Sequence, residues 1–176
     1  MIISISGAHG TGKSTVAKIL ASKLGLKYYS TGEAFRELAE EKGMSLEEFT
    51  KYVEKHSEID KELDEKVIQV AKEGNVVIES QLAGHLLKDV ADLRIHLKCP
   101  LEIRVKRMAE RDGTSKEEKL KETLIRENSE LKRFMELYNI NLNDENAILK
   151  IHDLIIDTQN MSIEEVVNTI LSKIKK

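Results

Sequence analysis

Short apolar runs alternate along the chain with stretches whose apolar residues recur every three or four positions. The short runs predict five strands, at Met1–Ser6, Leu26–Tyr29, Asn75–Glu79, Leu93–Leu97 and Leu154–Asp157. Between the first two, Val16, Ala17, Leu20 and their neighbours have helical spacing, which predicts a helix over Lys13–Leu24 that Gly25 ends. Strands that alternate with helices are typical of βαβ units, so we expect an α/β fold with a parallel sheet.

Two further stretches are helical in pattern and rich in charge. The first, residues 31–73, is too long for one crossover helix, and it predicts an inserted helical subdomain with a break near His56–Ser57. The second runs from Ser115 to Tyr138. Three Ser-x-x-Glu sequences predict capping boxes at helix starts, and they begin at Ser45, Ser115 and Ser162.

The segment between the first strand and the first helix reads G-A-H-G-T-G-K-S and matches the P-loop pattern, Gly-x-x-x-x-Gly-Lys-Ser. Its glycines allow a tight loop whose N–H groups face phosphate oxygens, and the following helix adds its partial positive charge. Lys13 would reach the β- and γ-phosphates of ATP, and Ser14 would bind Mg²⁺. The predicted nucleotide-binding residues are Gly7, Ala8, His9, Gly10, Thr11, Gly12, Lys13, Ser14 and Thr15.

Other motifs narrow the class of nucleotide-binding protein. The chain has no Asn-Lys pair, which a GTPase would use to recognise guanine, and no Leu-Ser-Gly-Gly sequence of a transporter ATPase. A small-molecule kinase remains. Such an enzyme works mainly by positioning phosphates and placing positive charge around them.

Composition limits the partners and the compartment. The chain has 176 residues, which suits a single domain over 1–176, with 40% hydrophobic residues, 34% charged residues and a net charge of −3. This charge predicts no attraction to nucleic acid or to a membrane surface. The short apolar start is unlike a signal peptide, no apolar run approaches the ~20 residues of a membrane span, and Cys99 is the single cysteine. We expect a monomer in the cytoplasm.

Arginines mark a possible acceptor side. Arg36 lies one turn into the helix that Ser30, Thr31 and Gly32 would cap. Arg104, Arg107 and Arg111 are spaced to share one helix face, and so are Arg126 and Arg133, with Glu130 between them. One interpretation is a salt-bridged helix surface. The other is a mobile lid whose arginines bind the transferring phosphate, which the guanidinium fork can grip with two hydrogen bonds.

Over nearly its whole length the chain resembles the cytidylate kinase family in its short archaeal form. The resemblance rests on the P-loop and on more specific segments: S-T-G-E-A-F-R-E-L-A, G-M-S-L-E-E-F-T-K-Y-V-E, L-A-G-H, the arginine-rich helices and Y-N-I-N. It implies transfer of a phosphoryl group from ATP to CMP or dCMP, with Mg²⁺. It also implies a three-layer P-loop NTPase fold, a five-stranded parallel sheet flanked by helices, with a monophosphate-binding helical insert at 31–73 and a lid at roughly 107–135.

The resemblance also implies site residues. Lys13, Arg126 and Arg133 would be catalytic, the two arginines by bridging the donor and acceptor phosphates. Ser30, Gly32 and Arg36 would face the monophosphate, and Glu130 would lie near the acceptor ribose. Gln81 and Gly84 would contact the acceptor nucleotide. Ser14 and Glu79 would serve the metal.

Three residues depart from the family pattern. Gln81 stands where an arginine is expected to contact the acceptor, His85 where an aromatic residue is common, and His9 where proline is frequent. His85 would either pack or stack on a base, and Glu79 would either hold a metal-bound water or pair with Lys13. Because Gln81 lacks charge, two alternatives stay open: a kinase for UMP or AMP, and a regulatory ATPase without kinase activity.

Overall fold

The structure, a computed structural model, describes residues 1–175. Its centre is one parallel sheet with the strand order β2-β3-β1-β4-β5. The strands are β1 (Ile2–Ser6), β2 (Lys27–Ser30), β3 (Val76–Glu79), β4 (Leu93–Lys98) and β5 (Leu154–Asp157). Ile3 of the central strand lies opposite Val77 on one side and Leu93 on the other. The five predicted strands and their parallel arrangement are confirmed.

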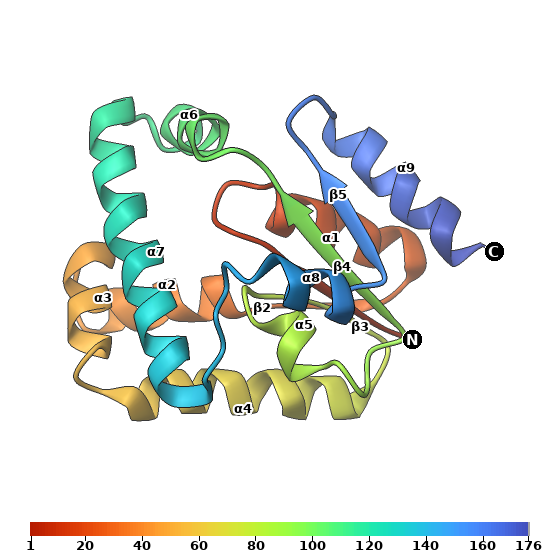
Figure 1. The fold of residues 1–176 in the computed structure, drawn as a ribbon, viewed down its shortest axis with the longest axis horizontal. Helices are drawn as coiled ribbons and strands as arrows, with labels where there is room; N and C mark the ends of the chain where they lie inside the picture. Colours follow the sequence, from red (N-terminus) through yellow and green to blue (C-terminus); the bar gives the residue numbers. More distant parts are fainter. Residues whose placement is uncertain (176) are drawn as a thin grey trace.

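Helices connect the strands and surround the sheet (Figure 1). They are α1 (Lys13–Leu24), α2 (Thr31–Glu41), α3 (Leu46–Val53), α4 (Ser57–Glu73), α5 (Ala83–Leu86), α6 (Leu101–Asp112), α7 (Lys116–Tyr138), α8 (Glu145–Ile151) and α9 (Ile163–Ile174). No helix within residues 1–175 is long and apolar enough to cross a membrane.

The two faces of the sheet bury different helices, because successive side chains of a strand point to opposite faces. Ile3 and Ile5 of β1 pack against α1 and α9 in the larger hydrophobic cluster. On the other face Val76 and Ile78 of β3 pack against α4 and α5. The result is the three-layer arrangement predicted from the sequence (Figure 1).

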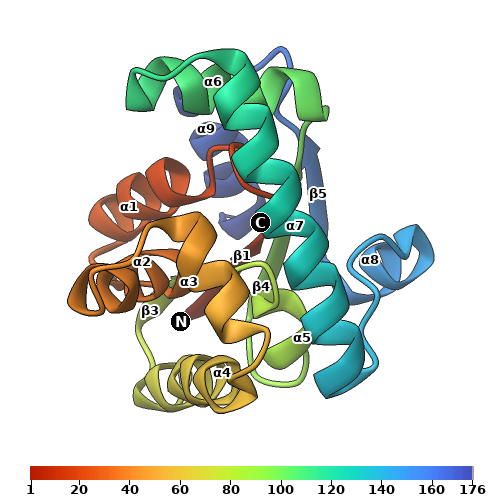
Figure 2. The same ribbon diagram turned by 90° about the vertical axis from the view of Figure 1, so that its left-hand side faces the viewer.

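The segment between β2 and β3 forms three helices with a small core of their own. Phe35, Phe49 and Leu63 are buried in this core, and the rings of Phe35 and Phe49 lie 4.7 Å apart. The predicted break is confirmed, since α3 ends at Val53 and α4 begins at Ser57. Helix α7 packs against α3 (Figure 2), so the second charged helical stretch lies over the first.

The structure moves three predicted strand starts by one residue: β1 begins at Ile2 rather than Met1, and the other two shifts have local reasons. Asn75 has a φ of 50°, a left-handed conformation that does not extend a strand, so β3 begins at Val76. Leu26 lies just beyond the end of α1, and its N–H is taken up by the helix terminus, donating to Ala21 O at 2.9 Å after the left-handed Gly25. Strand β2 therefore begins at Lys27.

The capping prediction was right in full at one of three sites. Ser162 accepts the N–H of Glu165, and the Glu165 carboxylate accepts the N–H of Ser162. Ser45 and Ser115 cap α3 and α7 by accepting one backbone N–H each. For these two helices the second bond of a capping box, from the N-cap N–H to the glutamate carboxylate, is absent from the described structure. The predicted capping boxes at Ser45 and Ser115 are therefore wrong, although both serines are N-caps.

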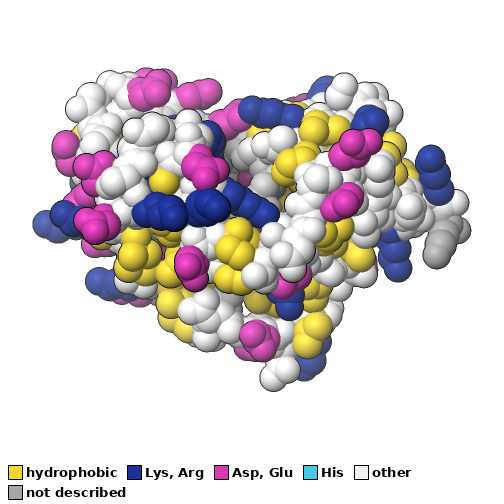
Figure 3. All heavy atoms as spheres, turned by 90° about the horizontal axis from the view of Figure 1, so that it is seen from above, with side chains coloured by type: hydrophobic (Ala, Val, Ile, Leu, Met, Phe, Trp, Pro, Cys, Tyr) yellow, Lys and Arg dark blue, Asp and Glu magenta, His cyan; other side chains and the backbone are white. Residues whose placement is uncertain are grey.

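The face drawn in Figure 3 carries both charges: several Lys and Arg side chains lie in a row across its middle, and Asp and Glu side chains lie around them. This arrangement agrees with the small net charge of the chain.

Candidate active site

The loop between β1 and α1 has the backbone conformation that a phosphate loop requires. Gly10 and Gly12 have φ values of 83° and 97°, in the left-handed region where glycine has no steric cost. A Cβ at Gly10 would also lie 2.9 Å from the Cβ of Arg104, which leaves no room for a side chain. The loop leads into the N-terminus of α1, whose unpaired N–H groups favour anions.

Lys13 lies at the first position of α1 and is 8% exposed. Its Nζ donates to the carbonyl oxygen of Ala8 at 3.3 Å. Burial lowers its pKa, and the nearby carboxylates of Glu79 and Glu130 oppose that shift. A buried ammonium without a firm carboxylate partner is well suited to attract a phosphate.

Glu79 ends β3 and is held by two serines. Ser14 Oγ donates to its Oε1 at 2.9 Å, and Ser30 Oγ makes a short hydrogen bond to the same oxygen. The side chain is only 2% exposed. Glu79 is thus bonded to Ser14, Ser30 and, at 3.4 Å, the Tyr28 hydroxyl, and it has no direct hydrogen bond to Lys13 in the described residues. The structure therefore does not show the pairing of Glu79 with Lys13 that was one of the two interpretations.

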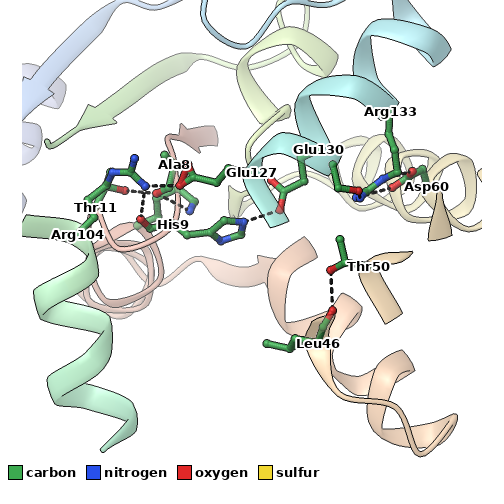
Figure 4. A network of polar contacts seen from close by, with 12 residues as sticks. Ala8, His9, Thr11, Leu46, Thr50, Asp60, Arg104, Glu127, Glu130 and Arg133 are labelled. Carbon is green, nitrogen blue, oxygen red and sulfur yellow. Dashed lines mark hydrogen bonds and ion pairs between the residues drawn. The ribbon is translucent and has the colours of Figure 1, made fainter. Parts of the chain in front are cut away.

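His9 links the loop to α7 (Figure 4). Its Nε2 lies 2.6 Å from Glu130 Oε1, so the imidazole donates to the carboxylate. Burial, together with the charge of Arg126, lowers the pKa of His9 to about 4. Burial opposes the ionised form of Glu130, but the His9 contact and the charges of Arg126 and Arg133 outweigh it and lower its pKa to about 2. Near neutral pH a neutral imidazole therefore holds an ionised carboxylate.

The two arginines of α7 differ in their partners. Arg133 donates from Nε to Asp60 Oδ2 at 2.8 Å and from Nη1 to Ser129 Oγ at 2.6 Å (Figure 4). Arg126 is equally buried, its guanidinium lies 6.0 Å from the Phe35 ring centre, and its Nε has no hydrogen-bond partner in the described structure. Burial lowers the pKa of Arg126. An unpaired buried guanidinium N–H is costly, and an anionic ligand would relieve that cost.

Most of these groups open onto one cleft of about 330 Å³. Thirteen of the residues predicted from the sequence line it: His9, Gly10, Gly12, Lys13, Ser14, Thr15, Gly32, Arg36, Glu79, Gln81, Arg126, Glu130 and Arg133. Gly7, Ala8, Thr11, Ser30 and Gly84 were also predicted, and they are absent from this lining. The phosphate loop and the arginine-bearing helices, far apart in sequence, therefore meet at one place.

Comparison with known proteins gives this arrangement a family. Residues 3–135 match the family described as an AAA domain. The chain is 46% identical to the cytidylate kinase of Methanocaldococcus jannaschii, over 99% of this chain and 97% of that protein. The chain belongs to the cytidylate kinase family. It is also 48% identical to the cytidylate kinase of Pyrococcus horikoshii, over 94% of this chain and 84% of that protein.

Solved structures share the fold of this cytidylate kinase family member at low sequence identity. Shikimate kinase from Aquifex aeolicus superposes with a TM-score of 0.61 at 20% identity, over 99% of this chain and 96% of the other. An uncharacterized protein from Eubacterium ventriosum gives a TM-score of 0.65 at 18% identity, with 100% and 99% coverage. At this identity the likeness concerns the fold alone.

Gly84 has a packing role in this family member. It is buried, its N–H donates to Ser6 Oγ at 2.8 Å, and the His152 ring lies where a side chain at position 84 would be. His85 also packs there, with its ring centre 6.4 Å from that of His152 in an edge-on arrangement. The structure therefore places both residues away from the cleft, and for His85 it favours packing over base stacking.

Two of the three arginines of α6 bind backbone rather than facing the cleft. Arg104 donates to His9 O at 2.9 Å and Cys99 O at 3.0 Å, and it pairs closely with Glu127. Arg107 donates to Thr158 O at 2.7 Å. Arg111 does line the cleft. The expectation that the three act together as a clamp does not fit Arg104, which supports the phosphate loop from behind.

A second cavity of about 350 Å³ lies on the other side of the phosphate loop. It is lined by Thr11, Thr15, Arg107, Thr158, Met161 and Ile163, among others. None of the residues after β5 was predicted as a site residue, and Ser162 was predicted only as a helix cap. The only signal available was their position, since ligands of open parallel sheets bind beyond the carboxyl ends of the strands.

Sequence reasoning also missed two acidic residues of α4. Asp60 and Asp64 line the cleft and are 4% and 6% exposed. Tyr138 donates its hydroxyl to Asp64 Oδ2 at 2.7 Å. Their spacing offered a signal, because positions 60, 63, 64 and 67 share one helix face and Leu63 and Val67 mark that face as buried.

Oxygen donors are available for a magnesium ion. Ser14 and Glu79 supply a hydroxyl and a carboxylate at the cleft, which are the hard ligands Mg²⁺ prefers. Within residues 1–175 no group of three or more His, Cys, Asp or Glu residues is arranged to hold a metal by itself. A site with one carboxylate and one hydroxyl fits a metal that is bound largely through substrate phosphates.

Proposed function

We propose that this chain is an ATP-dependent nucleoside monophosphate kinase that transfers the γ-phosphoryl group of ATP to CMP or dCMP. The observation that carries the proposal is the meeting of the phosphate loop, Lys13 and the arginines of α2 and α7 in one cleft. The cytidylate kinases that it matches at 46–48% identity support the choice of acceptor.

On the donor side, the backbone N–H groups of residues 9–15 and the N-terminus of α1 would hold the ATP phosphates. Lys13 would leave the Ala8 carbonyl and bind the β- and γ-phosphates, whose charge offsets the desolvation of its ammonium. The second cavity, beside Thr158 and Ile163, would take the adenine.

Ser14 and Glu79 would serve Mg²⁺, Ser14 directly and Glu79 through a bound water. The ion would neutralise charge on the β- and γ-phosphates of the nucleotide. Ser14 would then turn its hydroxyl oxygen from Glu79 toward the metal site, and Glu79 would stay ordered through its bond to Ser30.

On the acceptor side, the insert over residues 31–73 would hold the monophosphate through Gly32 and Arg36, with Ser30 as the N-cap of α2. Arg126 and Arg133 would bridge the two sets of phosphates, and Glu130 would contact the ribose. The region around 107–135 would act as a lid that excludes water, so that ATP is not simply hydrolysed. No general base is needed, since the phosphate monoester is already anionic near neutral pH.

We further propose that the protein acts as a monomer in the cytoplasm on free nucleotides, without nucleic-acid or membrane partners. The small net charge and the mixed charges in Figure 3 support this. The single cysteine is compatible with a reducing compartment.

The test is ADP release from ATP and Mg²⁺ with CMP, dCMP, UMP, AMP and GMP offered singly. We expect CMP or dCMP to give the highest rate and Lys13→Ala to abolish it. Lys23→Ala is the matched control, since Lys23 is exposed on the same helix and should leave the rate unchanged. A higher rate with UMP or AMP would reassign the acceptor. ATP binding without stimulation by any monophosphate would refute the kinase assignment and favour a regulatory ATPase.

A further inference from the structure

His9 connects two sides of the cleft. Its backbone belongs to the phosphate loop, and its carbonyl oxygen accepts from Arg104 Nη1 at 2.9 Å. Its side chain reaches across to α7, where Nε2 lies 2.6 Å from Glu130 Oε1 (Figure 4). The two residues are 121 positions apart in the sequence. A side chain of the loop that would bind the donor therefore contacts the helix that carries Arg126 and Arg133.

The orientation of Glu130 depends on this contact. The His9 ring supplies the only hydrogen bond to the Glu130 carboxylate within residues 1–175. The second carboxylate oxygen, Oε2, has no partner among the described residues, and both side chains line the cleft. The bond therefore fixes one oxygen of the carboxylate and leaves the other free to accept a hydrogen bond from a ligand.

The cations near Glu130 would otherwise draw the carboxylate toward themselves. The charges of Arg126 and Arg133 act on it, and both arginines are buried in the lining of the same cleft. Neither arginine forms an ion pair with Glu130 in the described part of the chain, and Arg133 binds Asp60 instead. An arginine and a carboxylate within reach of each other readily form a bidentate pair. The bond from His9 holds Glu130 out of such a pair.

The imidazole makes this contact as a neutral donor. An ionised carboxylate only accepts hydrogen bonds, so the proton of the His9 ring lies on Nε2. Burial, with the charge of Arg126 adding to it, lowers the pKa of His9 to about 4, so the ring is uncharged near neutral pH. His9 therefore orients the carboxylate without cancelling its charge, and the free oxygen remains a strong acceptor.

We propose that His9 is a positioning residue for the acceptor nucleotide, because it orients Glu130 so that the free carboxylate oxygen accepts a hydrogen bond from a ribose hydroxyl. The backbone of His9 serves the donor phosphates, and its side chain serves the other substrate. The inference rests on the proposed function, which places Glu130 at the acceptor ribose. It also gives a role to one of the three departures from the family pattern, since the proline that is frequent at position 9 has no side-chain donor.

The test uses an acceptor that lacks the ribose hydroxyls. Dideoxy-CMP keeps the base and the phosphate of CMP, but it has no hydroxyl at the two ribose carbons that could donate to Glu130. We measure kcat/KM for CMP and for dideoxy-CMP at saturating ATP and take the ratio of the two values. A general disturbance of the phosphate loop or of α7 lowers both values together, so the ratio reports the ribose contact.

Two substitutions at position 9 differ only in the reach of the same amide group. In His9→Gln the amide nitrogen lies near the place of Nε2 and can still donate to Glu130. In His9→Asn, which is one methylene shorter, the amide nitrogen ends near the place of Nδ1. We expect the ratio to stay within about twofold of its original value in His9→Gln and to fall roughly tenfold in His9→Asn, as for loss of a hydrogen bond to a charged group.

A matched control makes the same change at another histidine. His56 lies at the start of α4, outside the cleft lining, and its side chain is 38% exposed. In His56→Asn both kcat/KM values should stay unchanged.

A double variant tests whether His9 acts through Glu130. In Glu130→Ala the carboxylate is absent, so the addition of His9→Asn should not lower the ratio any further. Thermal unfolding of each variant shows whether it folds. If His9→Asn does not fold, His9→Leu takes its place in both measurements, since it fills part of the space of the ring and has no donor.

The outcomes separate the inference from the proposed function. An unchanged ratio in His9→Asn, or in His9→Leu where that variant is used, overturns the inference and leaves the kinase assignment intact. An equal fall in His9→Gln and His9→Asn also overturns it, and so does equal use of CMP and dideoxy-CMP by the unmodified protein. A further fall in the double variant would show that His9 does not act through Glu130. If no monophosphate stimulates the unmodified protein, the proposed function itself fails.

Discussion

The contact between Gly84 and His152 yields a prediction that separates a packing role for Gly84 from a substrate-binding role. In Gly84→Ala the new Cβ would lie 2.9 Å from Cδ2 and Cε1 of the His152 ring and nearer still to Nε2. His152 is 8% exposed and its Nδ1 is bonded to Ile148 O at 2.9 Å, so the ring has little room to move. Overpacking of this kind costs about 1–3 kcal/mol.

The helical position of Gly84 offsets part of this cost. Alanine is favoured over glycine inside a helix by about 0.5–1 kcal/mol. The net loss in the free energy of unfolding should be about 1–2 kcal/mol, which corresponds to a fall in Tm of about 2–8 °C for a chain of this size. Thermal unfolding followed by circular dichroism measures it, and KM for CMP should change little because Gly84 is absent from the cleft lining.

A double-mutant cycle tests the cause. In a His152→Ala background the ring is absent, so Gly84→Ala should be neutral or stabilising by about 0.5–1 kcal/mol. The interaction free energy between the two sites should then be about 1.5–3 kcal/mol. Equal destabilisation in both backgrounds would refute the packing argument. A large rise in KM for CMP with an unchanged Tm would instead support the substrate contact predicted from the sequence.

Two other variants test single contacts. In Arg104→Lys the ammonium cannot reach His9 O and Cys99 O together, so KM for ATP should rise roughly five- to tenfold in steady-state assays while KM for CMP stays the same. Arg94→Lys, at the partly exposed ion pair with Asp153, is the control. Equal effects on both substrates would contradict a role of Arg104 behind the phosphate loop. Burial, together with the nearby His152, lowers the pKa of His96 in the folded protein to about 4. In the unfolded chain the pKa of a histidine is about 6.5, so between these two values the unfolded chain binds more protons than the folded one. Stability should therefore fall as the pH drops from about 6.5 toward 4, and urea unfolding of His96→Gln should show a smaller fall, whereas an identical pH dependence would rule out His96 as its source.

The sequence predicted the sheet and the phosphate loop well because both depend on local patterns. Short apolar runs marked each strand, the first three of them beside a glycine, and the strand-loop-helix context of residues 7–15 left few structural alternatives. The errors at Asn75 and Leu26 arose from left-handed residues and a helix end, whose backbone angles a hydrophobic pattern does not report.

The roles of individual charged residues were harder to predict, because they depend on what each helix packs against. Arg104 and Arg111 are seven residues apart on one helix, yet one is buried behind the phosphate loop and the other lines the cleft. Asp60 belongs to the charged helical stretch over residues 31–73, and its partner Arg133 lies 73 residues away in the sequence. Long-range partners of this kind leave no trace in local spacing.

Glu79 connects the two halves of the proposed reaction. One of its oxygens accepts from Ser14, which begins the donor side, and from Ser30, which caps the helix that carries Arg36. A change of partner at Ser14 leaves that oxygen to Ser30 and, at 3.4 Å, to the Tyr28 hydroxyl. By thermodynamic reciprocity, whatever the donor nucleotide does to acceptor affinity through this carboxylate, the acceptor does equally to donor affinity. Heterotropic cooperativity between the two nucleotides would then be built into a single side chain at the end of β3.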